Sequence, residues 1–172
     1  EKAKKELGFE GTDVEVALAA YRKWGVASFA KLRGAFAFAI EDGTKTILVR
    51  DHFGVYPLYY YDGQSFLYGT SVRGLLDRGV PRKLSRAGLC TFMAYGALQH
   101  PWTMIDGVLC VPPASYLVKD SANGSVQINE YWIPKFEIKQ WRPDELNEAI
   151  MSALFESVKR QVQYGGNPSA FL

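Results

Sequence analysis

The 172-residue sequence predicts an α+β fold built around a two-layer antiparallel sheet. Apolar residues alternate in size over positions 34–40, hairpin turn signals follow at 42–43 and 62–63, and helical patterns lie before and after this region. A period of two is typical of strands, and strands grouped between helices are typical of α+β proteins.

The central strand alternates large side chains with alanines: Phe36, Phe38 and Ile40 against Ala35, Ala37 and Ala39. The small face lets a second layer come close. Asp42-Gly43 is a hairpin turn signal before the return strand at 47–49. The strands at 58–61 and 66–68, joined at Asp62-Gly63, extend this hairpin into a predicted antiparallel meander.

Helices are predicted on both sides of these strands. Thr12 and Glu15 form a capping box for a helix that ends at Gly25, and a short helical piece covers 26–32. Further helices are expected at 71–76 and 85–95. Three more strands are expected at 108–111, 116–119 and 126–130. A turn at Asn123-Gly124 joins the last two of them.

A domain boundary is predicted between Trp132 and Asp144. Residues 135–143 resemble a linker, and apolar residues then recur at helical spacing from 144 to about 164. Gly165-Gly166 ends this helix before a short extended run. We therefore divide the chain into 1–134, a linker at 135–143, and the start of a second domain at 144–172.

Composition narrows the function classes. Hydrophobic residues make up 48% of the chain and the net charge is +2, without a basic stripe, so a nucleic-acid partner is not expected. No apolar run reaches the roughly 18 residues of a membrane helix. Cys90 and Cys110 lack metal or redox spacing and are interpreted as small buried hydrophobes. We predict a soluble, cytoplasmic protein without a membrane partner.

A few polar residues are candidates for chemistry. Asp13 lies in a helix's first turn, where a carboxylate interacts favourably with the dipole without needing a ligand. Arg50 and Asp51 are interpreted as a structural ion pair or pair of caps at the end of the central hairpin. His52 and His100 have no partner at catalytic spacing.

Two motifs carry a family resemblance. Gly-Ala-Phe-Ala-Phe-Ala-Ile at 34–40 and Arg-Asp-x-Phe-Gly-x-x-Pro-Leu-Tyr-Tyr at 50–60 resemble the glutaminase domain of glutamine-dependent asparagine synthetases, which are class II amidotransferases. The resemblance implies an N-terminal-nucleophile hydrolase fold, an αββα sandwich that is incomplete here. It also implies that the first helix and strand of an α/β ATP-pyrophosphatase-like domain follow.

The resemblance also implies roles for individual residues. Thr12-Asp13-Val14-Glu15-Val16 matches the family pattern whose aspartate binds the α-amino group of glutamine, so Asp13 takes that role. Leu172 matches a leucine that lies against ATP. The family's nucleophile is an N-terminal cysteine, whereas this chain begins at Glu1, so we expect an internal fragment without catalytic residues and inactive alone.

The full-length enzyme implied by the resemblance hydrolyses glutamine and passes the ammonia to a second site. There ATP and Mg²⁺ activate aspartate, and ammonia converts it to asparagine. This fragment alone is expected to hold neither cofactor nor metal, and a homodimer is a further expectation. Tyr56, Ser71 and Ala114 stand where lysine, glutamate and glycine are common in the family, which leaves the acceptor open.

Alternatives remain. One is a synthetase-like relative that acts on another carboxylic acid, such as a β-lactam-forming synthetase. Another is a catalytically silent sandwich used for binding. Amidotransferases that act on sugars share the Arg-Asp and Pro-Leu features, but the Tyr131-Trp132 exit and the long helix fit the synthetase plan better.

Overall fold

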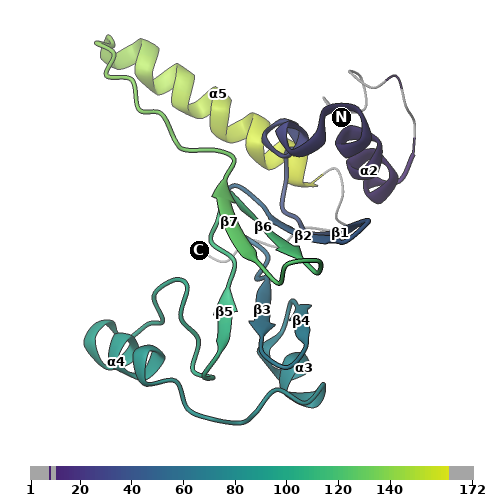
Figure 1. Ribbon diagram of the computed structural model, residues 1–172. Coiled ribbons are helices and arrows are strands. Elements are labelled where there is room, and N and C mark those ends of the chain that lie inside the picture. Colours follow the sequence, from purple (N-terminus) through teal and green to yellow (C-terminus); the bar gives the residue numbers. More distant parts are fainter. Residues whose placement is uncertain (1–7, 9–10, 163–172) are drawn as a thin grey trace. The chain divides into compact units, whose positions relative to one another are not determined.

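The computed structural model describes residue 8 and residues 11–162. The chain divides into two compact units, Glu1–Ile133 and Pro134–Leu172, which are described separately. The helical segments are α2 (Asp13–Trp24), η1 (Gly25–Lys31), α3 (Val72–Asp77), α4 (Arg86–Tyr95) and α5 (Pro143–Val162) (Figure 1). The strands are β1 (Ala37–Asp42), β2 (Lys45–Arg50), β3 (Tyr59–Asp62), β4 (Phe66–Gly69), β5 (Val108–Cys110), β6 (Ser115–Asp120) and β7 (Val126–Glu130).

The α-helices of the first unit begin at hydroxyl side chains. Thr12, Ser71 and Ser85 each accept a hydrogen bond from a backbone N–H group in the first turn of α2, α3 and α4. Such caps satisfy N–H groups that have no partner inside the helix. The capping box predicted from Thr12 and Glu15 is present, and Gly25 ends α2 as expected.

The strands form two antiparallel sheets with the orders β1-β2-β6-β7 and β4-β3-β5. The prediction of one continuous meander over 34–68 is therefore wrong, because the β1–β2 and β3–β4 hairpins belong to different sheets. The segment between Arg50 and Tyr59 carries the chain across, with Gly54 at φ 64°. Periodicity identifies strands, but it does not tell which sheet each strand joins.

The two sheets share one apolar core. It consists of residues from β2, β3 and β6 and from the segments beside β3 and β5: Leu48, Leu58, Tyr60, Val111 and Leu117. Ala37 packs against the same core, so the alanine face of the central strand meets the second layer at this residue, whereas Ala35 and Ala39 are exposed. The face with the large side chains points away from this core, and there Ile40 of β1 packs with Phe29 of η1.

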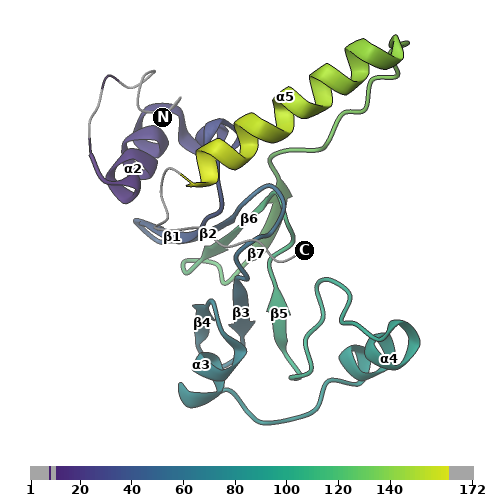
Figure 2. The ribbon, with the colours of Figure 1, turned by 180° about the vertical axis from the view of Figure 1, so that it is seen from behind.

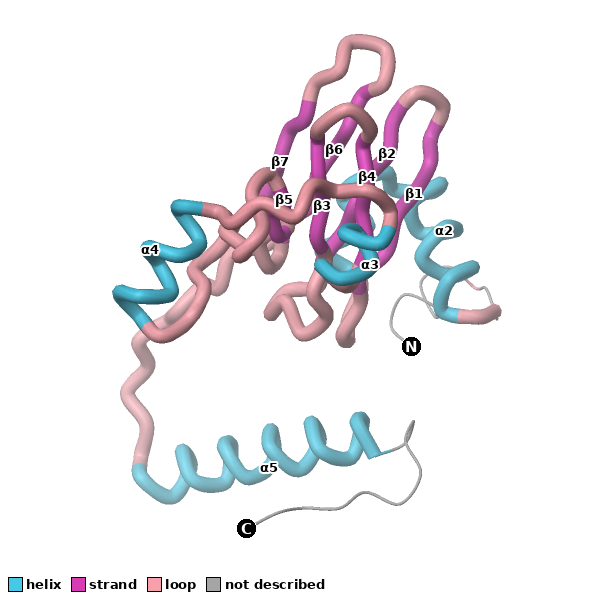
Figure 3. The backbone as a smooth tube through the Cα atoms, turned by 90° about the horizontal axis from the view of Figure 1, so that it is seen from below, coloured by secondary structure: helices cyan, strands magenta, loops and turns pink. Residues whose placement is uncertain are grey.

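The second sheet carries a helix on its outer face. Leu75 of α3 is buried with Val80 and Val108, and Tyr59 and Tyr61 of β3 pack against them. α3 lies beside β4 and β3 (Figure 2). The layers therefore follow the order helix, sheet, sheet, helix, which is an αββα sandwich, and the predicted α+β class is confirmed (Figure 3).

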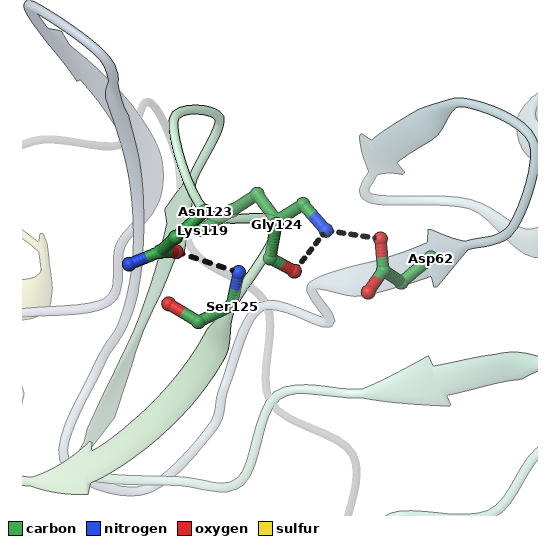
Figure 4. A network of polar contacts seen from close by, with 5 residues as sticks. All are labelled: Asp62, Lys119, Asn123, Gly124 and Ser125. Carbon is green, nitrogen blue, oxygen red and sulfur yellow. Dashed lines mark hydrogen bonds and ion pairs between the residues drawn. The ribbon is translucent and has the colours of Figure 1, made fainter.

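A partly buried ion pair links the sheets. Lys119 Nζ of β6 donates to Asp62 Oδ1 of β3 at 2.6 Å and to the carbonyl of Gly124 at 2.9 Å (Figure 4). The side chains are 14% and 35% exposed, respectively. Asn123 Oδ1 accepts from Ser125 N at 2.9 Å, which stabilises the turn that presents the Gly124 carbonyl.

The second unit contains α5, which has Asp144 and Glu145 in its first turn and Lys159 and Arg160 in its last turn, so its charges complement the helix dipole. The predicted helix at 144–164 agrees with α5 as far as residue 162. Its apolar stripe is exposed: Leu146, Ile150, Leu154, Val158 and Val162. Among the described residues, no helix combines the length and apolarity needed to cross a bilayer.

Candidate functional site

Asp13 is the first residue of α2, directly after its N-cap. Thr12 N donates to Glu15 Oε2 at 2.8 Å, and Glu15 N donates to Thr12 Oγ1 at 3.4 Å. Hydrogen bonds from the backbone and hydroxyl of Thr12 lower the pKa of Glu15. Asp13 takes no part in this capping box and is exposed. Glu15 therefore serves the cap, whereas Asp13 is an exposed carboxylate in the first turn of α2.

α2 contacts β1 near both ends of the strand. Val16 is buried with Leu32, and Phe36 and Phe38 pack against this pair. Near the end of α2, Tyr21 Oη donates to Asp42 Oδ2 at 2.8 Å. Burial, together with that carboxylate, raises the pKa of Tyr21 to about 12. These contacts fix how α2 lies on the strand and hence where Asp13 is presented.

Asp51 binds main-chain donors from two segments. Its carboxylate accepts from the N–H groups of Val55 at 3.0 Å, Phe53 at 3.1 Å, Tyr56 at 3.2 Å and Phe36 at 3.4 Å. Burial opposes ionisation of this side chain, which is 1% exposed. The four N–H groups outweigh burial and lower the pKa of Asp51. Asp51 is therefore an anion that organises the loop.

Arg50 binds main-chain acceptors of the same loop and of the segment after β5. Its Nε donates to the carbonyl of Tyr56 at 2.9 Å, Nη2 to Gly54 at 2.8 Å, and Nη1 to Val111 at 2.7 Å. Nη1 also lies 3.1 Å from Cys110 Sγ. Of the two arrangements expected from the sequence, the pair of caps is present, because both side chains bind backbone groups.

Gly54 is required for this packing. A Cβ atom there would lie 2.9 Å from Cζ and Nη2 of Arg50 and 3.0 Å from Cγ of Pro113. Its φ of 64° also belongs to the left-handed region, which side chains disfavour. The Phe-Gly step in the 50–60 motif thus reflects close approach of the guanidinium to the backbone.

His52, which follows Arg50 and Asp51, is surrounded by aromatic side chains. Its ring centroid is 5.1 Å from that of Trp132, 5.2 Å from Tyr131 and 6.3 Å from Phe36, all in edge-to-face contact. Burial lowers the pKa of His52. Tyr131 Oη donates to the carbonyl of Arg50 at 2.6 Å. His52 is thus a packing residue that joins the loop to the last residues of the first unit.

The two cysteines have different environments. Cys110 is buried, and burial raises the pKa of its thiol even though Arg50 is adjacent, so it remains a protonated packing residue. Cys90 in α4 is exposed, so its predicted burial is wrong. α4 approaches the fold through its first turn, where a Cβ on Gly88 would meet the Thr103 carbonyl, and Cys90 lies beyond that contact.

Two expectations from the sequence stay predictions, namely the ATP contact of Leu172 and the absence of a bound metal. Leu172, the expected ATP contact, lies outside the described residues, so its role stays a prediction. Within residues 11–162 and residue 8, no cluster of His, Cys, Asp and Glu side chains is arranged to hold a metal ion. His100 is exposed at the surface, and partial loss of hydration of its ring, together with the charge of Arg50, lowers its pKa.

Sequence reasoning missed several contacts that shape this region. The hydrogen bond from Tyr131 to Arg50 spans 81 positions, and the contact between Arg50 and Cys110 spans 60. No local pattern predicts pairs so far apart. A signal for Gly54 was available, because a glycine close after an Arg-Asp pair suggests a turn with close backbone approach.

Comparison with known proteins identifies the family. Residues 2–132 match the family described as a glutamine amidotransferase domain. The putative glutamine-hydrolyzing asparagine synthetase 2 of Methanocaldococcus jannaschii is 26% identical over 94% of this chain and 33% of its own length. The glutamine-hydrolyzing asparagine synthetase 3 of Bacillus subtilis is 31% identical over 94% of this chain and 28% of its own length.

Among solved structures, a glutamine phosphoribosylpyrophosphate amidotransferase from B. subtilis aligns with a TM-score of 0.49 and 19% identity, covering 77% of this chain and 26% of that one. The chain spans about a third of the length of the curated relatives that it matches. Because the family match covers most of the chain, from the segment before α2 to the residues that follow β7, residues 2–132 belong to the glutamine amidotransferase domain family.

Proposed function

We propose that this chain is part of a glutamine-dependent asparagine synthetase and that Asp13 binds the α-ammonium group of glutamine. The proposal rests on the family match together with the position of Asp13, an exposed carboxylate on the first turn of a helix that is fixed at its cap and along its length. A carboxylate facing an ammonium group is a strong recognition pair, since charge-assisted hydrogen bonds are stronger than neutral ones.

The proposed reaction has two parts. Glutamine is hydrolysed at its side-chain amide, so the C–N bond breaks, water supplies the hydroxyl group and ammonia leaves. In the second part, the aspartate carboxylate would displace pyrophosphate from ATP to give an adenylate, with Mg²⁺ neutralising the phosphate charges, and ammonia would then displace AMP to form asparagine. The N-terminal cysteine nucleophile, the ATP and aspartate sites, a homodimeric state and a cytoplasmic location all belong to the proposed full-length protein.

The role of Asp13 is tested in the full-length protein. Asp13→Asn should raise the KM for glutamine about 10- to 100-fold, because a hydrogen bond to a charged group is worth about 1.5–3 kcal/mol. The rate with free ammonia should stay unchanged, because ammonia bypasses the glutamine pocket. An unchanged KM for glutamine would remove Asp13 from the site.

Glu15→Gln is the matched control. It removes a negative charge from the same helical turn, but Glu15 serves the capping box. Glutamine at this position keeps an acceptor for the Thr12 N–H group, so the cap persists, and we expect an unchanged KM for glutamine with at most a small loss of stability. The acceptor is identified separately, by pyrophosphate release from ATP with aspartate and with other carboxylic acids. Release with another acid and not with aspartate would favour the alternative synthetase.

A further inference from the structure

We propose that Asp51 is a positioning residue for Asp13 and that it acts through Phe36 and the Val16 contact on α2. This inference rests on the proposed function, in which Asp13 binds glutamine. The path consists of contacts between neighbouring residues, and it assigns to the Arg-Asp motif a role beyond closing the central hairpin.

The first step joins Asp51 to Phe36 through both the carbonyl and the N–H group of Phe36. Asp51 N donates to the Phe36 carbonyl at 2.9 Å, and Phe36 N lies 3.4 Å from Asp51 Oδ2. Asp51 is 1% exposed and makes further hydrogen bonds within its loop. A residue held in this way has little freedom to move, so the backbone of Phe36 is fixed just before β1 begins.

The second step joins Phe36 to α2. The Phe36 side chain packs against the buried pair Val16 and Leu32, and its ring lies 5.5 Å from that of Phe38. Val16 N also donates to the Thr12 carbonyl at 3.0 Å. Val16 is thus in the helical turn that begins at Asp13, and a shift of Phe36 displaces the start of the helix that carries the carboxylate.

The third step is that this path does not include Arg50. The guanidinium contacts Gly54, Tyr56, Val111 and Cys110, all of which lie away from Phe36 and α2 in sequence. Adjacent residues in one loop therefore have separable roles. The Asp51 side chain connects the loop to Phe36 just before β1, whereas the Arg50 side chain connects it to Val111 after β5. The two side chains also share Tyr56, whose N–H group donates to Asp51 and whose carbonyl accepts from Arg50.

The experiment measures glutamine KM, ammonia-dependent rate and melting temperature in the full-length protein. Asp51→Asn and Phe36→Leu should each raise the KM for glutamine about tenfold while sparing the ammonia-dependent rate, since a displacement near 1 Å at a recognition group can cost as much as about 100-fold. The double variant should raise KM no more than the stronger single variant, because both changes interrupt one path.

Two controls separate positioning from general loss of stability. Arg50→Lys perturbs the same loop from its other side, and Leu75→Ala opens a cavity beside the second sheet. Both should lower the melting temperature and leave the KM for glutamine unchanged. A rise in KM with either control would overturn the proposed path. If Asp51→Asn does not fold, Phe36→Leu alone carries the test.

The outcomes also distinguish this inference from the proposed function. If Asp13→Asn raises the KM for glutamine while Asp51→Asn and Phe36→Leu do not, Asp13 keeps its role and the positioning path is wrong. If Asp13→Asn leaves KM unchanged, the proposed glutamine contact fails, and the positioning role fails with it. Multiplicative effects in the double variant would show two independent routes and contradict the single path.

Discussion

Arg50 and Asp51 are neighbours in sequence and satisfy opposite polar groups of the same loop. The guanidinium accepts no hydrogen bonds and binds carbonyl groups, whereas the carboxylate binds N–H groups. Buried charges are costly unless hydrogen bonds replace their hydration. In the described part of the chain, no buried side-chain nitrogen or oxygen lacks a partner, so both charges are stabilised by the loop that they order.

The protonation of Asp51 should appear in the pH dependence of stability. A pKa lowered in the folded state contributes stability that is present above the unfolded value of about 3.9 and is lost as the pH falls through the folded value. Asp51→Asn should cost about 1–3 kcal/mol near pH 7, because buried N–H groups lose their charged acceptor.

The difference in the free energy of unfolding between the unsubstituted protein and Asp51→Asn should shrink below about pH 4. Only the unsubstituted protein has an Asp51 carboxylate whose contribution is lost on protonation. Urea unfolding of both proteins between pH 7 and pH 2 measures this convergence. Two curves that stay parallel over the acid range would contradict the assignment of Asp51 as a hydrogen-bonded anion.

At the scale of elements, the loop between β2 and β3 directs the chain from one sheet to the other. Gly54 in this loop and Gly43 in the turn between β1 and β2 separate two reasons why a position requires glycine. Both have φ near +60°, at 64° and 62°, but a Cβ on Gly43 would meet no atom within 4 Å. A side chain at position 43 would therefore meet only an unfavourable backbone conformation, whereas a side chain at position 54 would also meet crowding.

Alanine at each position should reveal this difference. Gly43→Ala should destabilise the protein by about 1 kcal/mol through the left-handed backbone. Gly54→Ala should cost about 1–3 kcal/mol more, because crowding displaces the Arg50 guanidinium. Denaturant unfolding of the two variants provides the comparison. Equal losses would show that the approach of Arg50 to Gly54 contributes no stability.

At the scale of the whole first unit, the sheets are joined by their shared apolar core and by polar contacts at its margin. Tyr68 Oη of β4 donates to Glu41 Oε1 of β1 at 3.1 Å, and Lys119 pairs with Asp62. Lys119 Nζ also lies 5.7 Å from the centroid of the Phe66 ring. These contacts bring together residues from both sheets.

A double-mutant cycle should measure the coupling across the sheets. Lys119→Met keeps the length of the side chain, and Asp62→Asn keeps the shape of its partner. We expect a coupling energy of about 1 kcal/mol, the upper part of the range for exposed pairs, because Lys119 is 14% exposed. Lys83 and Asp106 form an exposed pair 2.9 Å apart and serve as the control. Coupling equal in both pairs would show that partial burial adds nothing.

Local sequence determined much of the first unit. The capping box at Thr12, the stop at Gly25, the hairpin at Asp42-Gly43 and the turn at Asn123-Gly124 depend on residues that are close in the chain, and all are present. The alternation of phenylalanines with alanines also predicted which face of the central strand meets a second layer. These features follow from local backbone preferences and from the period of two in a strand.

The tertiary structure alone decided which strands share a sheet, which polar groups Arg50 and Asp51 bind, and the exposure of Cys90. Each depends on contacts between segments far apart in sequence, whose pairing is set by the total burial of apolar surface and by the satisfaction of buried polar groups. The position of Asp13 depends both on local sequence and on tertiary contacts. Its place in the first turn is local, whereas its presentation depends on the packing of α2 against β1 through Val16 and Phe36.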